Sequence, residues 1–169
     1  MRSLALADIG GKVQVTRRGN AISPVLQGGE TQDEWLARLA KVVGSTDNEI
    51  AEFTLVMLSS ALGRGDDIAL NAILAQLQEM EPKNAIERCL IIQMLLTSYK
   101  SIQALAASSG SILQEEIEAK VASAIRFMRL YLQQCEVFRK LRNGGNQTIT
   151  INHMSVDKAV IGNPALGRG

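Results

Sequence analysis

The fold is decided by residues 112–142, ILQEEIEAKVASAIRFMRLYLQQCEVFRKLR. Apolar and small side chains recur here at alternating spacings of four and three, which is typical of a helix that packs along a partner helix. The seam consists of Ile117, Val121, Ala124, Met128, Tyr131, Cys135 and Phe138. Acidic residues open the stretch and basic residues close it, in agreement with the helix dipole. The sequence predicts one helix of about 45 Å.

The preceding helix is predicted to run from Pro82 to about Ala107, with a turn at Ser108–Ser111. Proline cannot extend a helix but suits its first turn. The run CLIIQMLL at residues 89–96 is apolar on nearly every helical face, which indicates a central, buried helix. Its eight residues are too few to cross a bilayer. The two long helices are therefore expected to form an antiparallel hairpin.

Shorter helices are predicted before this hairpin. Thr31–Glu34 and Thr46–Glu49 fit a capping box, as does Ser111–Gln114 at the start of the last helix. Gly63 suits the end of the second helix, and Asp66-Asp67 suits the start of the third. The predicted fold class is mainly α: a helical bundle dominated by a long antiparallel αα-hairpin, with a short C-terminal β segment.

The predicted helical domain, residues 31–142, is preceded by an irregular N-terminal arm, residues 1–30. Glycine pairs and Pro24 punctuate the arm, so that no long helix can form there. Lys12–Thr16 alternates apolar and polar residues and could form one short strand, which needs a partner to be stable.

A β-type tail, residues 143–169, is predicted to follow the helices, because Gln147–His153 alternates in polarity. Two interpretations remain open. The tail either folds as a hairpin against the helical bundle, where Lys12–Thr16 could be its mate, or adds strands between subunits. The candidate oligomerisation or partner-binding residues are Ile149, Ile151, His153, Val156, Val160 and Ile161.

No set of residues fits a catalytic, cofactor or metal site. His153 is the single histidine and is expected to be a packing or hydrogen-bonding residue. Dinucleotide, phosphate-loop and paired CxxC motifs are missing from the sequence. Cys89 and Cys135 lie in apolar helical patterns and are expected to be small buried side chains. We therefore expect no cofactor, no metal and no enzyme activity.

Composition narrows the class of protein further. Aromatic residues make up only 4% of the chain, so the core must consist mainly of Leu, Ile, Ala, Val and Met, which favours helix packing. The net charge of +1 argues against a generally basic nucleic-acid binder. Residues 1–12 lack the charged start and apolar stretch of a secretory signal. The sequence predicts a soluble, cytoplasmic protein.

Basic residues nevertheless gather on the last helix. Between Lys120 and Arg142 the only acidic residue is Glu136. One interpretation is a phosphate-contacting helix face; the other is compensation of the helix dipole together with ordinary solvation. The candidate contacts to nucleic acid are Arg126, Arg129, Arg139, Lys140 and Arg142.

Several segments together suggest a lineage: EPKNAIER at residues 81–88, QML at 93–95, the long helix, and QTITINHMSVDKAVIGN at 147–163. They resemble a family of uncharacterised proteobacterial and prophage-associated proteins, which carry an EPKD-like helix start and a tail similar to QKVTVxHVxVxxGGQAIVGN. The resemblance covers roughly residues 46–163. The chain departs from the family pattern at Asp157–Ala159, where the family tends to have GGQA. The resemblance implies a lineage, and no established activity comes with it.

The order of elements also resembles phage terminase small subunits, which combine short helices, a long oligomerising hairpin and a β segment. Residues 31–81 do not form a clear helix-turn-helix, because Val42, Val43, Val56 and Met57 leave little polar recognition surface. The leading hypothesis is therefore a non-enzymatic homo-oligomer, bacterial or prophage-associated, that assembles through its hairpin and tail, with no role at a membrane. The tail could also dock another protein. The alternative is a nucleic-acid-binding oligomer of the small-terminase kind, used in DNA packaging.

Overall fold

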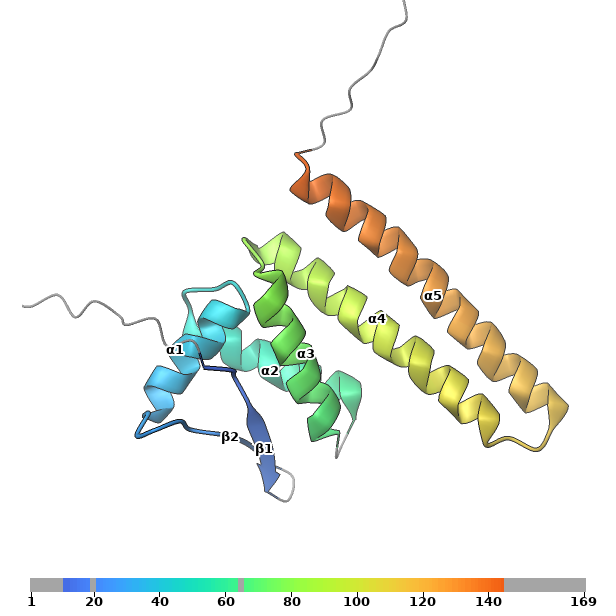
Figure 1. The fold of residues 1–169 in the computed structure, drawn as a ribbon, viewed down its shortest axis with the longest axis horizontal. Coiled ribbons are helices and arrows are strands. Elements are labelled where there is room, and N and C mark those ends of the chain that lie inside the picture. The colour runs from blue at the N-terminus through green and yellow to red at the C-terminus, as the bar shows by residue number, and fades with distance from the viewer. Residues whose placement is uncertain (1–10, 19–20, 64–65, 145–169) are drawn as a thin grey trace, which may run out of the picture.

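The computed structural model describes residues 11–18, 21–63 and 66–144. Their helices are α1 (Gln32–Val42), α2 (Asn48–Leu62), α3 (Asp67–Met80), α4 (Ala85–Ser109) and α5 (Gln114–Arg142). Figure 1 shows α1, α2 and α3 gathered on one side of α4, while α5 runs antiparallel along another. The prediction of a mainly α fold dominated by a long antiparallel hairpin is confirmed. The β-type tail lies outside the described residues.

The described β structure lies near the N-terminus, within the segment predicted to be an irregular arm. Strand β1 (Val15–Arg18) pairs antiparallel with β2 (Ala21–Pro24), and Val15 stands opposite Pro24. The sequence predicted one short strand at Lys12–Thr16, with the tail as a possible internal mate; the observed strand begins three residues later, and its mate is β2.

Strand β1 is fixed to the helices by side chains of α3. The Asn71 amide accepts a hydrogen bond from the Val15 N–H at 2.8 Å and donates one to the Val15 carbonyl at 3.0 Å, as a neighbouring strand would. Arg17 pairs with Asp67 at 3.0 Å. Val13 and Val15 are almost fully buried. The β hairpin therefore belongs to the same packed body as α1, α2 and α3.

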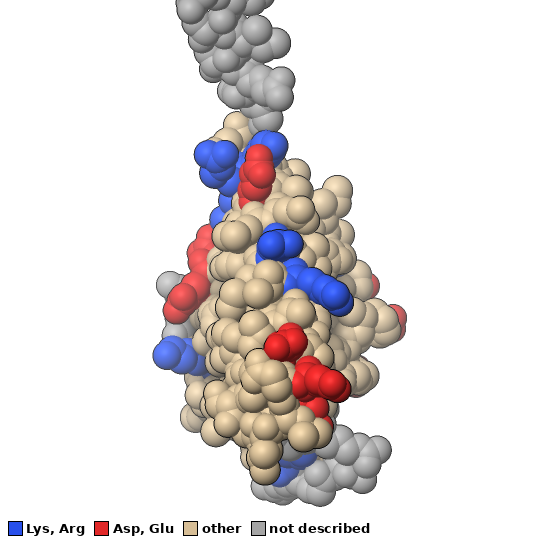
Figure 2. All heavy atoms as spheres, turned by 90° about the vertical axis from the view of Figure 1, so that its right-hand side faces the viewer, with Lys and Arg blue, Asp and Glu red and all other residues tan. Residues whose placement is uncertain are grey.

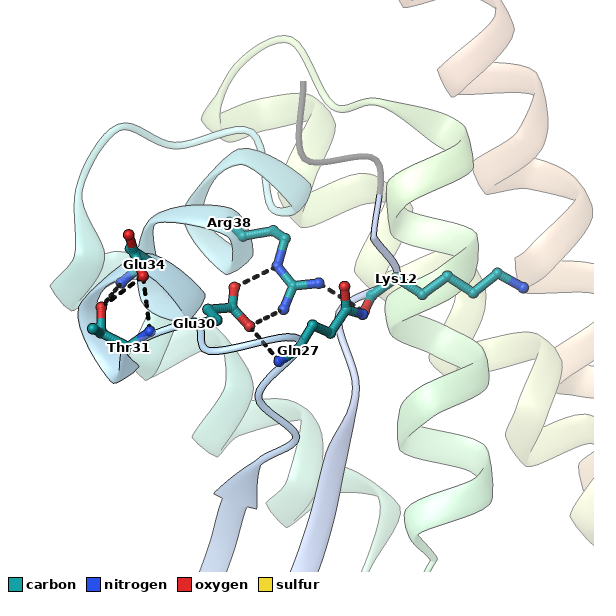
Figure 3. A network of polar contacts seen from close by, with 6 residues as sticks. All are labelled: Lys12, Gln27, Glu30, Thr31, Glu34 and Arg38. Carbon is teal, nitrogen blue, oxygen red and sulfur yellow. Dashed lines mark hydrogen bonds and ion pairs between the residues drawn. The ribbon is translucent and has the colours of Figure 1, made fainter. Parts of the chain in front are cut away.

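A network around Arg38 holds the arm against α1 (Figure 3). The guanidinium forms an ion pair with Glu30 at 2.6 Å, and both side chains are at least nine-tenths buried. Arg38 also donates to the Lys12 carbonyl at 3.0 Å, and the Gln27 side chain donates to the same carbonyl at 2.9 Å. Ion pairs of this kind are stable when further hydrogen bonds satisfy the buried groups, as these do. The network connects Lys12 and Glu30, near the two ends of the described part of the arm, to α1.

The core lies between the three short helices and one face of α4. The largest fully buried side chains are Trp35, Leu39, Leu58, Leu70, Leu74, Leu77, Ile91, Val13 and Val43. Helix α4 adds Ile91, Ile92 and Leu95 to this cluster. The prediction that α4 is buried all round is wrong, because Cys89 and Gln93 are exposed. Cys89 is thus not the buried side chain that the pattern predicted, and Cys135 is only partly buried.

Gly63 ends α2 as predicted, and the helix starts agree with the predicted N-terminal caps at two of four positions. Thr31 and Glu34 form the predicted capping box, and Asp66 caps α3 by accepting from the Ala69 N–H. Asp47 rather than Thr46 caps α2, since its carboxylate accepts from the Glu49 N–H. The predicted box at Ser111 is wrong: α5 begins after Leu113, without a side-chain cap.

The start of α4 also differs from the prediction. Its cap is Asn84, which accepts from the Glu87 N–H at 2.9 Å, so Pro82 lies before the helix and not in its first turn. Among the described helices, α4 is the one with the length and apolar composition to cross a membrane, a longer stretch than the run at residues 89–96. Central helices of packed proteins can have the same composition, and 28% of the apolar stretch of α4 is buried in the described structure.

Candidate interaction surface

The predicted seam of α5 faces α4. Ala124 is fully buried, and Ile117, Val121, Tyr131, Cys135 and Phe138 are partly buried, while Met128 keeps 39% of its surface exposed. Phe138 packs against the edge of the core, and the Arg142 guanidinium lies 4.6 Å from the centre of its ring. Helix α5 thus packs along α4 and reaches the rest of the body near its C-terminal end.

Arg142 is held in place by the fold, although about a third of its side chain is exposed. Its Nη2 donates to the carbonyls of Met80 and Glu81 at 2.6 and 3.0 Å and to the Glu87 carboxylate at 2.9 Å. Burial raises the pKa of Glu87, but the hydrogen bond from the Lys83 N–H and the contact with Arg142 outweigh this effect. The net result is a pKa below the ordinary value of a glutamate. Of the five candidate nucleic-acid contacts, Arg142 is the one engaged by the fold.

The other four basic candidates lie on the surface. Arg126, Arg129, Arg139 and Lys140 are all exposed. Lys140 pairs with Glu136 at 2.8 Å, one helical turn away. Within the described residues Arg126, Arg129 and Arg139 form no ion pair at 4.0 Å or less. Of the five basic residues proposed to contact phosphate, three arginines therefore remain without an ion pair among the described residues.

The outer surface of α5 is apolar to a degree that the sequence-based seam did not suggest. Seven large apolar side chains of this helix are exposed: Ile125, Phe127, Met128, Leu130, Leu132, Val137 and Leu141. Leu132 is 65% exposed and Val137 is 54% exposed. At 100° per residue they fall on two flanks, one on each side of the face that packs on α4. Only the remaining strip of α5 is polar.

Charge is segregated along the same helix. Glu115, Glu116 and Glu118 lie at its N-terminal end, and its last turn carries Arg139, Lys140 and Arg142. Figure 2, which views the side of the molecule on which α5 lies, shows basic groups at the top and middle, a cluster of acidic groups lower down, and a large uncharged surface around them. One end of α5 is thus electrostatically complementary to the other.

A smaller exposed apolar group lies on α2. Ile50, Phe53, Val56 and Met57 are all exposed, and Phe53 keeps 64% of its surface in solvent. Val56 and Met57, which entered the helix-turn-helix argument, are 54% and 47% exposed. Val42 and Val43, by contrast, are buried in the core.

No group of three or more His, Cys, Asp or Glu side chains within residues 11–18, 21–63 and 66–144 could hold a metal ion. A shallow hollow lies between Gln27 and Glu34, but its two carboxylates are already engaged: Glu30 by Arg38, and Glu34 by the Thr31 cap. The predicted tail contacts, Ile149 to Ile161 with His153, lie outside the described residues.

No protein-family model, curated protein or solved structure matches the chain. The resemblance to a prophage-associated family therefore stays a prediction. The exposed apolar flanks of α5 and the segregation of its charges are the features from which a function can be argued.

Proposed function

We propose that this protein is a non-enzymatic structural or interaction protein that acts as a homo-oligomer and assembles through its helical hairpin. One observation carries the proposal: α5 leaves seven large apolar side chains exposed, although one of its faces is already packed on α4. Large exposed apolar patches mark interaction sites in soluble proteins, and the exposed side chains follow one another along two flanks of α5.

The energetic argument favours burial of this surface. Full burial of a Leu, Ile or Phe side chain contributes roughly 1.5–3 kcal/mol. If each of the seven exposed side chains of two copies gained half of this free energy, the sum would be comparable with the cost of association. That cost, the loss of translational and rotational freedom, is roughly 4–15 kcal/mol. Burial of the α5 side chains can therefore offset the cost of association without any contribution from the tail.

Native mass spectrometry and light scattering of the full chain test the proposal. We expect a defined oligomer at micromolar concentration. Leu132→Asp should lower its mass, because the substitution buries an unpaired carboxylate in the contact. Gln133→Asp is the matched control, since residue 133 lies on the polar strip of the same turn and its substitution should leave the mass unchanged. A full-length protein that stays monomeric at about 100 µM would overturn the proposal.

The tail, residues 143–169, is proposed as a second assembly or partner-docking element. The alternating pattern of residues 147–153 predicts a strand, and a strand there would offer backbone donors and acceptors to a neighbouring copy. Deleting residues 146–169 should keep the helical circular-dichroism signal and lower the oligomer order. An unchanged number of subunits would show that the hairpin alone drives assembly.

Nucleic-acid binding is the second candidate function, and the three exposed arginines without an ion pair among the described residues favour it. Such binding should weaken steeply as salt is raised, and Arg126→Ala with Arg129→Ala should weaken it without changing the fold. A long duplex and micromolar protein at low salt provide the test. The absence of any gel shift under these conditions would remove this candidate.

A further inference from the structure

One flank of α5 carries apolar side chains along its middle and charges of opposite sign at its two ends. Its members are Glu118, Val121, Ile125, Met128, Leu132, Cys135 and Arg139, at spacings of three and four, and we call them the α5 stripe. Met128 is the middle member; three residues precede it and three follow it. The stripe has an apolar centre, with an acidic residue at one end and a basic residue at the other.

The centre of the α5 stripe is accessible. Ile125, Met128 and Leu132 are 43%, 39% and 65% exposed, while Val121 and Cys135 are partly buried beside α4. Glu118 and Arg139 are exposed at the ends, about 32 Å apart along the helix axis. The Glu118 carboxylate accepts a hydrogen bond from the Gln114 side chain at 2.9 Å and forms no ion pair with a described residue.

We propose that the α5 stripe of one copy packs antiparallel against the same stripe of a second copy, around a twofold axis at Met128. This inference rests on the proposed homo-oligomer and specifies its contact. Ile125 of each copy then faces Leu132 of the other, and Met128 meets Met128. At both ends Glu118 of one copy lies opposite Arg139 of the other. A twofold contact of this kind uses one self-complementary surface and closes on itself.

Charge decides between the two directions of packing. In a parallel pair Glu118 would lie beside Glu118 and Arg139 beside Arg139, so both ends would repel. In the antiparallel pair both ends attract, and the acidic start of each α5 lies along the basic finish of the other. Charges at the edge of such a helix pair select orientation in this way. The second flank, with Phe127, Leu130 and Val137, has no comparable arrangement of charges at its ends.

Cross-linking between single cysteines tests the direction and the register. In a full-length background with Cys89→Ser and Cys135→Ser, one protein carries Ile125→Cys and another carries Leu132→Cys. The two are mixed, equilibrated and treated with a short bis-maleimide. We expect a covalent dimer in the mixture and almost none in either protein alone. Leu130→Cys, about 180° around the helix from the stripe, is the control and should link to neither protein.

Each other outcome overturns the inference in a distinguishable way. Links within each single-cysteine protein show parallel packing, and an oligomer without links at either position shows another interface. Both results leave the proposed homo-oligomer standing. A monomer removes both proposals. A monomer whose cysteine at position 132 is shielded from maleimide shows instead that another part of the same chain covers the stripe.

A charge exchange gives an independent test. Glu118→Arg alone and Arg139→Glu alone should each raise the dimer dissociation constant about tenfold, because each creates two repulsive contacts. The double variant should restore affinity to within about twofold of the original, since both attractive contacts return with opposite sign. Arg126→Glu, on the far side of the helix, is the control for altered net charge. Two single-variant effects that add in the double variant would rule out the pairing of Glu118 with Arg139.

Discussion

Arg142, in the last turn of α5, donates to the carboxylate of Glu87 in the first turn of α4 at 2.9 Å, and so closes the open end of the helical hairpin. The same Nη2 reaches the carbonyls of Met80 and Glu81, where α3 ends. These carbonyls lack partners within their own helix, and a cation there also suits the helix dipole. One guanidinium therefore joins the ends of three helices.

This contact predicts a dependence of stability on pH. The folded-state pKa of Glu87 lies below its ordinary value, so its contribution is complete above the unfolded pKa of about 4.3 and is lost as pH falls through the folded pKa. Glu87→Gln should cost about 1–3 kcal/mol at pH 7 and reduce the loss of stability on acidification. Urea unfolding at pH 7 and pH 3 measures both effects. A loss of stability equal to that of the parent between these pH values would contradict the assignment.

The Arg38–Glu30 pair should be among the most sensitive polar contacts. Arg38→Ala leaves Glu30 buried without its partner and removes a donor from the Lys12 carbonyl, so the expected loss is about 3–5 kcal/mol. Lys41→Ala, an exposed position on the same helix, should change stability by less than about 0.5 kcal/mol. Chemical denaturation of the two variants gives the comparison. Equal effects would show that the network does not hold the arm.

Gly44 should tolerate no side chain. Its φ is +66°, and a Cβ there would lie 2.1 Å from the Pro82 carbonyl oxygen, so Gly44→Ala requires movement of the backbone before α4. We expect a loss above about 2 kcal/mol. Gly28→Ala is the control, because its φ is also positive but nothing lies within 4 Å of the added carbon. It should cost only the conformational strain, about 1 kcal/mol. Melting temperatures decide whether the two variants differ as expected.

Helix α4 should show a sharp contrast between neighbouring positions. Ile92→Asp places an unpaired carboxylate where only 7% of the side chain is exposed, and it should unfold the protein, whose total stability is expected to be roughly 5–15 kcal/mol. Gln93→Asp alters the exposed face of the same turn and should leave the fold intact. Circular dichroism at 25 °C separates the two results. A folded Ile92→Asp variant with an unchanged melting point would mean that α4 is not central.

The long hairpin could be predicted because the residues that determine it lie close together in the sequence. The spacing of the seam residues and the charges at the helix ends lie within one segment. The β1–β2 pair could not be predicted, because the contacts that hold β1 come from residues far away in the sequence. Arg17 is unremarkable in sequence, and it is held in a strand by Asp67, fifty residues away, beside the contacts that Asn71 makes with Val15. Burial of Arg38 likewise depends on where Glu30 comes to lie.

The candidate surface was only half predictable. The sequence shows that α5 is apolar on more than one face, but the packing on α4 decides which residues stay exposed. Ile125 and Leu132 are exposed because the seam of α5, and not the flank that carries them, packs on α4. The basic residues of the helix were foreseen, whereas the engagement of Arg142 by α3 and α4 was not, because those carbonyls lie about sixty residues away in sequence.

Helix α4 has a further consequence for how the chain melts. It supplies Ile91, Ile92 and Leu95 to the core of the short helices, while Met94, on another face, is buried outside that cluster, as is Ala124 of α5. Both the three short helices and α5 need α4 as a packing partner. When α4 unfolds together with either group, the other group therefore loses the surface on which it packs. Residues 11–144 should consequently unfold in a single cooperative step, with calorimetric and van't Hoff enthalpies that agree under conditions where the protein is monomeric.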